Sequence, residues 1–446
     1  MYRQAVILLF IAATALAADP PDINAHVVLP DLKLHPSLKD SNVNVQAPLL
    51  DSGTQAELPN SGAQAPTAIP DAREEMSDSG DEEPLPDLGA PNWKCDPAVM
   101  AKSKEVPKSV HSVRFADIKV VAALGDSQSA GNGANSSKLT SLRTEYRGLA
   151  FAIGGDTTLD EHITIPNILR KFNPDLFGYS NGAGVWNEWN VSRLNMAVPG
   201  SEAKDMIVQA QRLVEVLRTR PEVNITDDWK LVHIFVGGND VCQYCHDWRK
   251  GRKSAHGPDT YKANLVKAIQ YLKDNLPRTI VSLTGMINIE VLRPVDKHNL
   301  VCKGLHFFYE CNCEFQKRKT RKVCFDYMEV QREIQDQGIF DSSDDFAFVI
   351  QPFTYGIERP PLTDEGRPDL RFFAPDCFHF SKFGHSNFAK HLWNNMVQRV
   401  GAKSTSVELS NVNSPLLCPP KNCPLFPTKK NSRNCKKYLT PSKLDV

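Results

Sequence analysis

Apolar residues gather in four short runs that are separated by long polar or mixed stretches. Each run contains several β-branched or aromatic residues, which is typical of buried strands. The runs cover residues 119–124, 231–236, 279–288 and 346–351. We therefore expect four strands in this order along the chain.

Stretches with helical spacing lie between and after these runs. The clearest is residues 202–218, EAKDMIVQAQRLVEVLR, where apolar side chains recur every three or four positions. Three others have a similar pattern, at residues 260–276, 325–337 and 386–400. Strands that alternate with helices predict an α/β fold in which helices cover both faces of a parallel sheet.

The two ends of the chain differ from this pattern. We expect residues 1–17 to be a secretory signal peptide, because one early positive charge precedes an apolar run too short for a comfortable membrane span; an uncleaved anchor is the alternative. Residues 18–90 are acidic and rich in Pro and Ser, which indicates a disordered segment or a propeptide. The folded domain is expected over residues 91–401, followed by a basic, cysteine-containing tail at 402–446 that disulfides could hold or proteolysis remove.

Charge and cysteine content narrow the class of protein. The formal net charge of the 446 residues is zero, so nothing global favours nucleic-acid binding. The chain has 11 cysteines, an odd number, which leaves at least one without a partner in the same chain. In a secreted protein we expect disulfides from Cys242, Cys245 and the cysteines of residues 302–324. A zinc site that uses His246 and His306 is the less favoured alternative. Glycosylation sequons begin at Asn135, Asn190 and Asn224.

Four short motifs carry candidate chemistry. They are GDS at residues 125–127, NMAVPGS at 195–201, VGGND at 236–240, and a last stretch that contains Asp376 and His379. Ser127 follows the first predicted strand and needs a base to lose its proton during attack on an acyl carbon. His379 can be this base, and Asp376, three residues earlier, can orient its imidazole.

The order of these motifs resembles the four sequence blocks of the GDSL, or SGNH, hydrolases. Longer stretches resemble the phospholipase B branch of that family: EYRGLAFAIGGD, TIPNILRKFNP, VGGNDVCQYC and PDCFHFSKFGHSNFAKHLWNNM. The resemblance implies a flavodoxin-like, three-layer α/β/α fold and a catalytic triad of Ser127, His379 and Asp376. It also implies an oxyanion hole formed by the Ser127 and Gly200 backbone N–H groups and the Asn239 amide. No metal or other cofactor is expected.

The activity implied by the resemblance is that of a secreted serine esterase. It would hydrolyse acyl esters of phospholipids or lysophospholipids at a membrane or micelle surface, through an acyl-enzyme. An acetylesterase acting on carbohydrate or another small ester, and a non-catalytic lipid-binding protein, are the alternatives. Relatives with several hydrolase repeats and a C-terminal anchor differ from this chain, whose single unit and polar tail favour a free extracellular enzyme; its oligomeric state stays open. Gln128-Ser129 also departs from many relatives, at a position expected to affect the pocket edge.

Three other residues could be mistaken for catalytic or metal-binding residues, because their type or local motif is similar. Ser180 lies in GYSNG, which matches the G-x-S-x-G nucleophile elbow, but both flanks are typical of loops. His385 is expected at the start of the last helix, and Asp240 lacks the partners of a metal site. Several aromatic residues could line an acyl groove or belong to the core: Phe151, Phe177, Tyr179, Trp186, Trp189, Phe353 and Phe378.

Overall fold

The computed structural model describes residues 85–249, 254–306, 311 and 317–445, all of which belong to one compact unit, Gly80–Val446. The predicted signal peptide and residues 18–84 of the predicted acidic segment lie outside the described residues.

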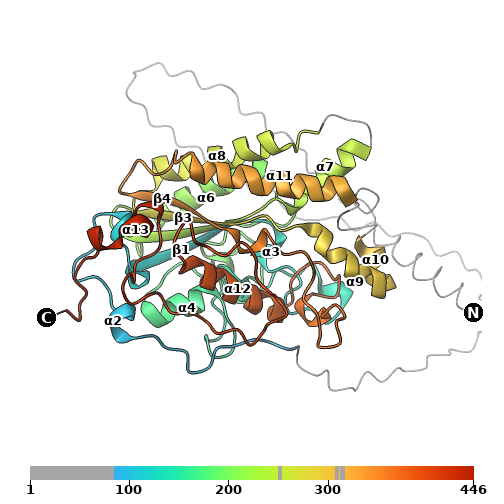
Figure 1. Cartoon of the computed structure of the whole chain (residues 1–446), viewed down its shortest axis with the longest axis horizontal. Coiled ribbons are helices and arrows are strands. Elements are labelled where there is room, and N and C mark those ends of the chain that lie inside the picture. The colour runs from blue at the N-terminus through green and yellow to red at the C-terminus, as the bar shows by residue number, and fades with distance from the viewer. Residues whose placement is uncertain (1–84, 250–253, 307–310, 312–316, 446) are drawn as a thin grey trace, which may run out of the picture. The chain divides into compact units, whose positions relative to one another are not determined.

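A parallel sheet of four strands forms the centre of this unit (Figure 1). Its strands are β1 (Ile118–Gly125), β2 (Trp229–Phe235), β3 (Thr279–Thr284) and β4 (Phe346–Gln351), and they lie side by side in chain order. All four strands predicted from the sequence are present. The prediction is wrong at the end of the third, which extends to Thr284 and not to residue 288. The Gly285 N–H still bonds to the Gln351 carbonyl, and the chain then leaves the sheet.

The outer side of β1 is paired with two separate short pieces of chain. Phe177 exchanges backbone hydrogen bonds with Lys119 and Val121, and the Ala123 N–H donates to the Leu194 carbonyl. Residues 179–193 loop out between these pieces. This loop contains Ser180, the serine of the GYSNG motif, which therefore lies beside the edge of the sheet.

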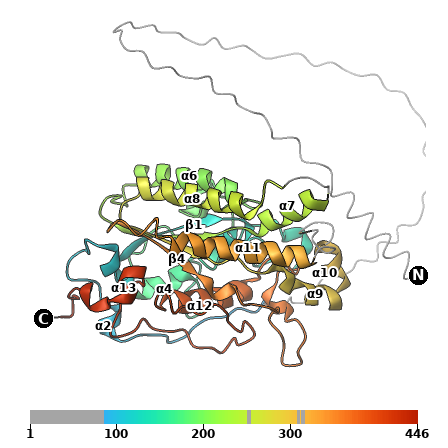
Figure 2. The same cartoon turned by 45° about the horizontal axis from the view of Figure 1, so that its top comes forward.

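Helices cover both faces of the sheet, as Figure 2 shows. Because side chains alternate along a strand, Ala122 and Leu124 belong to the core on one face, while Val121 and Ala123 belong to the core on the other. The first face packs against α6 (Met206–Thr219), α7 (Gly238–Arg249), α8 (Pro258–Asn275) and α11 (Lys317–Asp336). The second packs against α4 (Ile165–Phe172) and α12 (Lys382–Met396). The predicted three-layer α/β/α fold is therefore confirmed.

Three predicted helices have other bounds than expected. The helix predicted at 386–400 begins at Lys382 and ends at Met396. In the stretch 202–218, α6 begins at Met206, since residues Ala203–Asp205 form a separate 3₁₀ turn closed by Glu202 and Asp205. The helix predicted at 325–337 begins at Lys317, because its first turns, KRKTRK, are helical without any apolar spacing. The remaining helices are short: α2 (Pro97–Met100), α3 (Ser127–Ala130), α5 (Trp189–Ser192), α9 (Arg293–His298), α10 (Leu300–Leu305) and α13 (Lys429–Arg433).

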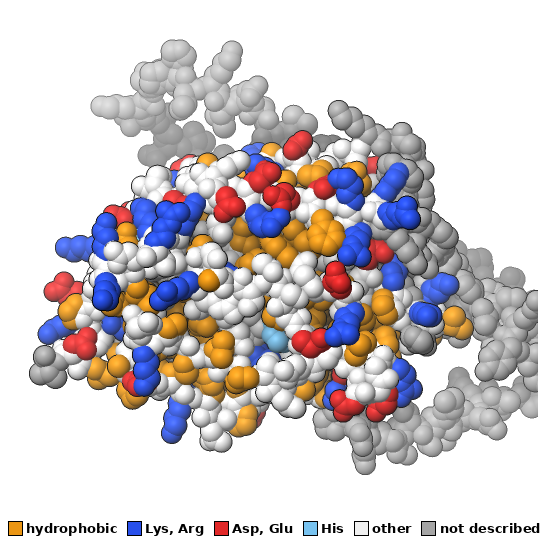
Figure 3. Space-filling model, viewed as in Figure 1, with side chains coloured by type: hydrophobic (Ala, Val, Ile, Leu, Met, Phe, Trp, Pro, Cys, Tyr) orange, Lys and Arg blue, Asp and Glu red, His pale blue; other side chains and the backbone are white. Residues whose placement is uncertain are grey.

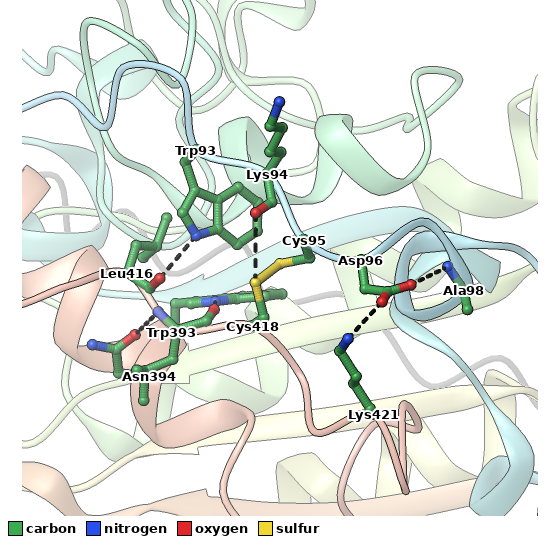
Figure 4. Close-up of a disulfide and its surroundings, with 11 residues drawn as sticks. Trp93, Lys94, Cys95, Asp96, Ala98, Trp393, Asn394, Leu416, Cys418 and Lys421 are labelled. Carbon is green, nitrogen blue, oxygen red and sulfur yellow. Dashed lines mark hydrogen bonds and ion pairs between the residues drawn. A yellow bond between two sulfur atoms is a disulfide. The ribbon is translucent and has the colours of Figure 1, made fainter.

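The C-terminal stretch from residue 402 packs against the domain. Cys418 forms a disulfide with Cys95, and Lys421 forms an ion pair with Asp96 at 2.7 Å (Figure 4). The Trp393 indole of α12 donates to the Leu417 carbonyl. Phe426 is fully buried in the core under α12, so this stretch contributes to the hydrophobic core.

The expectation of several disulfides is confirmed. Besides Cys95–Cys418, the structure has Cys242–Cys311, Cys302–Cys377 and Cys423–Cys435. Cys245 is also disulfide-bonded, whereas Cys324 is a free, buried thiol. Among the described residues, no helix combines the length and the hydropathy needed to cross a bilayer.

Candidate active site

The Ser127 side chain lies where β1 ends and a short helix begins. Asp126 caps this helix, α3, by accepting a hydrogen bond from the Gln128 N–H at 3.0 Å. Gly125 is needed here because a Cβ atom would lie 2.4 Å from the Ser129 hydroxyl and 2.6 Å from the Phe235 carbonyl oxygen. The tight turn presents Ser127, which is partly exposed, at the carboxyl end of the sheet.

Ser127, His379 and Asp376 form a continuous hydrogen-bonded chain. The Ser127 hydroxyl lies 2.8 Å from His379 Nε2, and His379 Nδ1 lies 2.6 Å from Asp376 Oδ2. The other carboxylate oxygen of Asp376 accepts the backbone N–H groups of Phe378 and His379, each at 3.0 Å. Burial alone would raise the pKa of Asp376, but the hydrogen bond and charge of His379, together with these N–H groups, lower it below its ordinary value. The structure thus brings the predicted nucleophile, base and orienting carboxylate together.

The loop that carries His379 is fixed from two sides. Cys377, two residues before the histidine, is bonded to Cys302 of α10. From the serine side, the Gln128 amide donates to the Phe378 carbonyl and accepts the Phe380 N–H, both at 3.3 Å. Gln128 also lines the pocket beside Ser127.

The two other predicted oxyanion donors lie next to each other. Gly200 is exposed, has a φ of +79°, and has open space where a side chain would be. Asn239, near the start of α7, donates one amide N–H to the Ser201 carbonyl at 2.9 Å. Because an amide has two N–H donors, a second one remains for a substrate oxygen. Asn239 and Ser127 line the same pocket.

Two buried side chains hold the Gly200 loop to the rest of the site. The Asp240 carboxylate accepts the Ala203 N–H through both oxygens, at 3.1 and 3.0 Å. Gln209 of α6 accepts the Gly125 N–H and donates to both the Gly125 carbonyl and the Ser201 hydroxyl. Burial raises the pKa of Asp240 to about 7, and the N–H bond from Ala203 opposes that rise. Asp240 therefore has a hydrogen-bond partner in the Gly200 loop.

An apolar pocket of about 70 Å³ opens beside Ser127. Its polar lining comes from Asp126, Ser127, Gln128 and Asn239. The remaining lining is almost entirely apolar, from Phe235, Val236, Gly238, Met286, Ile287, Ile289, Val291, Leu292, Phe378 and Phe380. Such a lining suits a hydrocarbon chain attached to the reacting ester.

A larger hollow of about 340 Å³ lies away from this site, near the amino ends of β1 and β2. Asp117, Lys119 and Asp228 are among its lining residues, and the Lys119 ammonium bonds to the Asp228 carboxylate. None of the predicted site residues lines it.

A family model described as GDSL-like lipase/acylhydrolase matches residues 121–392. The chain belongs to this family. Its α/β fold and the resemblance noted in the sequence are thereby confirmed, and the predicted enzyme class, carboxylic ester hydrolase, is the class of the family.

Curated relatives include membrane-associated phospholipase B1 from Homo sapiens, which is 39% identical over 73% of this chain, and from Rattus norvegicus, 36% identical over 74%. The matched region spans only 22% and 23% of those proteins. Among solved structures, an acetylxylan esterase from Geobacillus stearothermophilus is similar at 17% identity and a TM-score of 0.33, covering 62% of this chain and 93% of that chain. Similarity at this level carries no argument about substrate.

Ser180 and His385, whose sequence patterns resemble functional motifs, lie away from the pocket beside Ser127 in this GDSL-family domain. The Ser180 hydroxyl is fully buried and donates to the Ser192 carbonyl at 2.8 Å. His385 lies inside α12, where burial lowers its pKa to about 3, and its Nδ1 accepts the Phe151 N–H. Of the seven aromatic residues considered for an acyl groove, Phe378 lines the pocket, whereas Phe151 and Phe353 belong to the core.

Cysteines and histidines offer little for a metal. Cys242 is in a disulfide, and His306 Nε2 lies 3.2 Å from the Cys377 carbonyl oxygen. Over the described ranges, no cluster of three or more His, Cys, Asp or Glu side chains has the geometry to hold an ion.

Sequence reasoning missed several residues of the site. Asp126 is noted only as part of the GDS block, although burial raises its pKa to about 6 directly beside Ser127. The pocket residues 286–292 were read as the end of a strand and as a connection. Gln209 looked like a polar position on a helix, because its bonds to Gly125 exist only in the folded chain.

Proposed function

We propose that this chain hydrolyses acyl esters of glycerophospholipids and lysophospholipids through a Ser-His-Asp triad. The observation that carries the proposal is the 2.8 Å contact between the Ser127 hydroxyl and His379 Nε2 at the mouth of an apolar pocket. The membrane-associated phospholipase B1 relatives support the choice of lipid.

In the first half of the proposed reaction, His379 takes the Ser127 proton as the oxygen attacks the ester carbonyl carbon. Asp376 keeps Nδ1 protonated and stabilises the imidazolium that forms. The negative oxygen of the tetrahedral intermediate accepts hydrogen bonds from the Ser127 N–H, the Gly200 N–H and the Asn239 amide. The imidazolium then gives its proton to the leaving alcohol, and an acyl-Ser127 ester remains.

In the second half, water replaces the alcohol. His379 removes a proton from the water as it attacks the acyl-enzyme, and later returns this proton to Ser127. A fatty acid leaves and the free enzyme is restored. The acyl carbons nearest the ester lie throughout in the pocket lined by Met286, Val291 and Phe378.

This apolar lining favours a fatty acyl chain over the acetyl group of an acetylated sugar. Assays of the purified protein on phosphatidylcholine, lysophosphatidylcholine and acetylated xylan separate these substrates. We expect free fatty acid from both lipids, no acetate from xylan, and no product with Ser127→Ala. Release of acetate alone would replace the lipid proposal by a carbohydrate one.

We further propose that the protein is secreted and glycosylated. Disulfides are typical of oxidising compartments, and Asn135, Asn190 and Asn224 are all exposed. Expression in a secreting animal cell should release the protein into the medium with a mass that falls on enzymatic removal of N-glycans. Retention in the cytosol would contradict this.

A further inference from the structure

We infer that α9 and α10 dock this chain on the phospholipid surface that holds its substrate; the inference rests on the proposed function. Leu300 and Val301 are the exposed apolar residues of this surface, and Lys297 and Lys303 are its exposed basic residues. These four residues are called the α9–α10 surface below.

The two apolar residues of the α9–α10 surface have a large exposed fraction. Leu300 is 85% exposed and Val301 53%, at the first two positions of α10. Both belong to a helix of six residues, Leu300–Leu305. Apolar side chains that protrude in this way suit a fluid lipid interface, which needs no complementary shape.

The α9–α10 surface is connected to the wall of the apolar pocket. The 3₁₀ turn Ile289–Leu292 lines the pocket with Ile289, Val291 and Leu292 and continues directly into α9. At the other end, the ring of His306, the residue after α10, contacts Phe378 edge-on. The α9–α10 surface is therefore continuous along the chain with one wall of the pocket.

A covalent bond also ties this surface to the catalytic loop. Cys302, the residue after Val301, is bonded to Cys377 between Asp376 and His379. Cys302 and Cys377 pack in one small cluster with Val295 of α9 and with Phe372 and Phe373. The docking helices and the proposed base thus share a rigid support.

Charge points to phospholipid rather than to an uncharged apolar partner. In sequence, α9 and α10 together carry three basic residues and one acidic residue, and Lys297 and Lys303 are exposed. Figure 3 shows hydrophobic and basic side chains next to each other over the end of the molecule where Figure 1 places α9 and α10. Lysines beside projecting apolar side chains fit the phosphates of a lipid headgroup layer.

The test measures binding separately from hydrolysis. The full chain is mixed with vesicles of ether-linked phosphatidylcholine, with or without a minority of ether-linked phosphatidylglycerol, which contain no cleavable ester. Leu300→Ser combined with Val301→Ser should weaken partitioning on the order of tenfold. Lys303→Ser should weaken it roughly fivefold, and mainly on the anionic vesicles.

Leu444→Ser is the matched control. Leu444 is 55% exposed and lies in the C-terminal stretch, where the neighbouring Lys443 N–H bonds to Lys102 beside the hollow at the amino ends of the strands. This variant should bind vesicles like the wild type. All variants should hydrolyse a monomeric short-chain ester with unchanged kcat/KM, which shows that they fold.

Each outcome bears on one proposal. Wild-type protein that binds neither vesicle, or a double variant that binds as tightly as the wild type, overturns the docking surface even if phospholipid is hydrolysed. A double variant that changes only the oligomeric state overturns it in favour of contact between copies of the chain. Failure of the wild type to cleave any ester, with the vesicle result intact, removes the proposed function and leaves the docking surface standing.

Discussion

Ser127 and Ser180 lie in two glycine-containing turns beside the same strand, and they differ in what their hydroxyls contact. Ser127 faces His379 at 2.8 Å and opens onto a pocket. Ser180 is fully buried, and its hydroxyl donates to the Ser192 carbonyl inside the loop at the sheet edge. The comparison teaches that a short motif does not define a nucleophile. A nearby base and access for a substrate define it, and both depend on distant parts of the chain.

The largest effect should come from the two serines themselves. Ser127→Ala should lower kcat by about 10⁶-fold, because the covalent step is lost, with little change in melting temperature. Ser180→Ala should keep normal kcat but destabilise the fold by about 0.5–1.5 kcal/mol, because the Ser192 carbonyl loses one of its two donors and keeps the Asn195 N–H. Ester kinetics and thermal melts of both variants check this. An inactive Ser180→Ala beside an active Ser127→Ala would reverse the comparison.

A smaller effect is expected from Asn239, which lines the same pocket as Ser127, compared with Asn181, which follows Ser180 in the chain. Asn239→Ala should lower kcat about 10²–10³-fold and leave KM within a few-fold, since the lost hydrogen bond strengthens only in the transition state. It should also cost ~1 kcal/mol of stability, because the amide donates to the Ser201 carbonyl. Asn181→Ala, next to Ser180, is the control and should keep normal kcat. Equal kinetics for the two variants would remove Asn239 from the site.

The Cys302–Cys377 bond should have a more moderate effect on turnover. Replacing both cysteines by Ala should lower kcat roughly 10–100-fold, because small displacements of His379 from Ser127 are costly. Replacing Cys423 and Cys435, a disulfide in the C-terminal stretch, should leave kcat unchanged. Both pairs should lose stability, typically about 2–4 kcal/mol. Turnover of the folded fraction, measured for each pair, separates positioning from stability; equal turnover would show that the loop needs no covalent support.

The smallest effect on turnover concerns the residue that precedes Ser127. Burial raises the pKa of Asp126 from 3.8 to about 6, so the folded chain holds a proton there that the unfolded chain releases. This contribution to stability is complete below pH ~4 and is lost as the pH rises through 6. Asp126→Asn should therefore gain up to about 3 kcal/mol relative to wild type between pH 4 and 7, while kcat changes less than about tenfold. Melting curves of both proteins across this range test the sign, and a gain on acidification instead would contradict it.

Much of the fold could be predicted from the sequence because its strands and long helices have strong hydrophobic periodicity. The contact between Asp376 and His379 could also be predicted, because the two residues lie three positions apart in a tight loop. The contact of His379 with Ser127 spans 252 residues, so its prediction depends on the chemistry of the two side chains and on the family resemblance, without any local signal.

What could not be predicted depends on contacts between distant segments. The pocket wall at residues 286–292 continues the apolar composition of β3, so nothing in the sequence marks the point where the chain leaves the sheet. Leu425 and Phe426 form a short apolar pair in a polar tail, and the burial of Phe426 beside Phe115 has no local signal.

The divided edge beside β1 also bears on behaviour at high concentration. A long, regular outer strand presents a row of N–H and C=O groups on which another chain can add, and this is a common route to aggregation. Here the outer pieces around Phe177 and Leu194 are short, and residues 179–193 interrupt them. The interruption makes this side of the sheet a poor template for growth by strand addition.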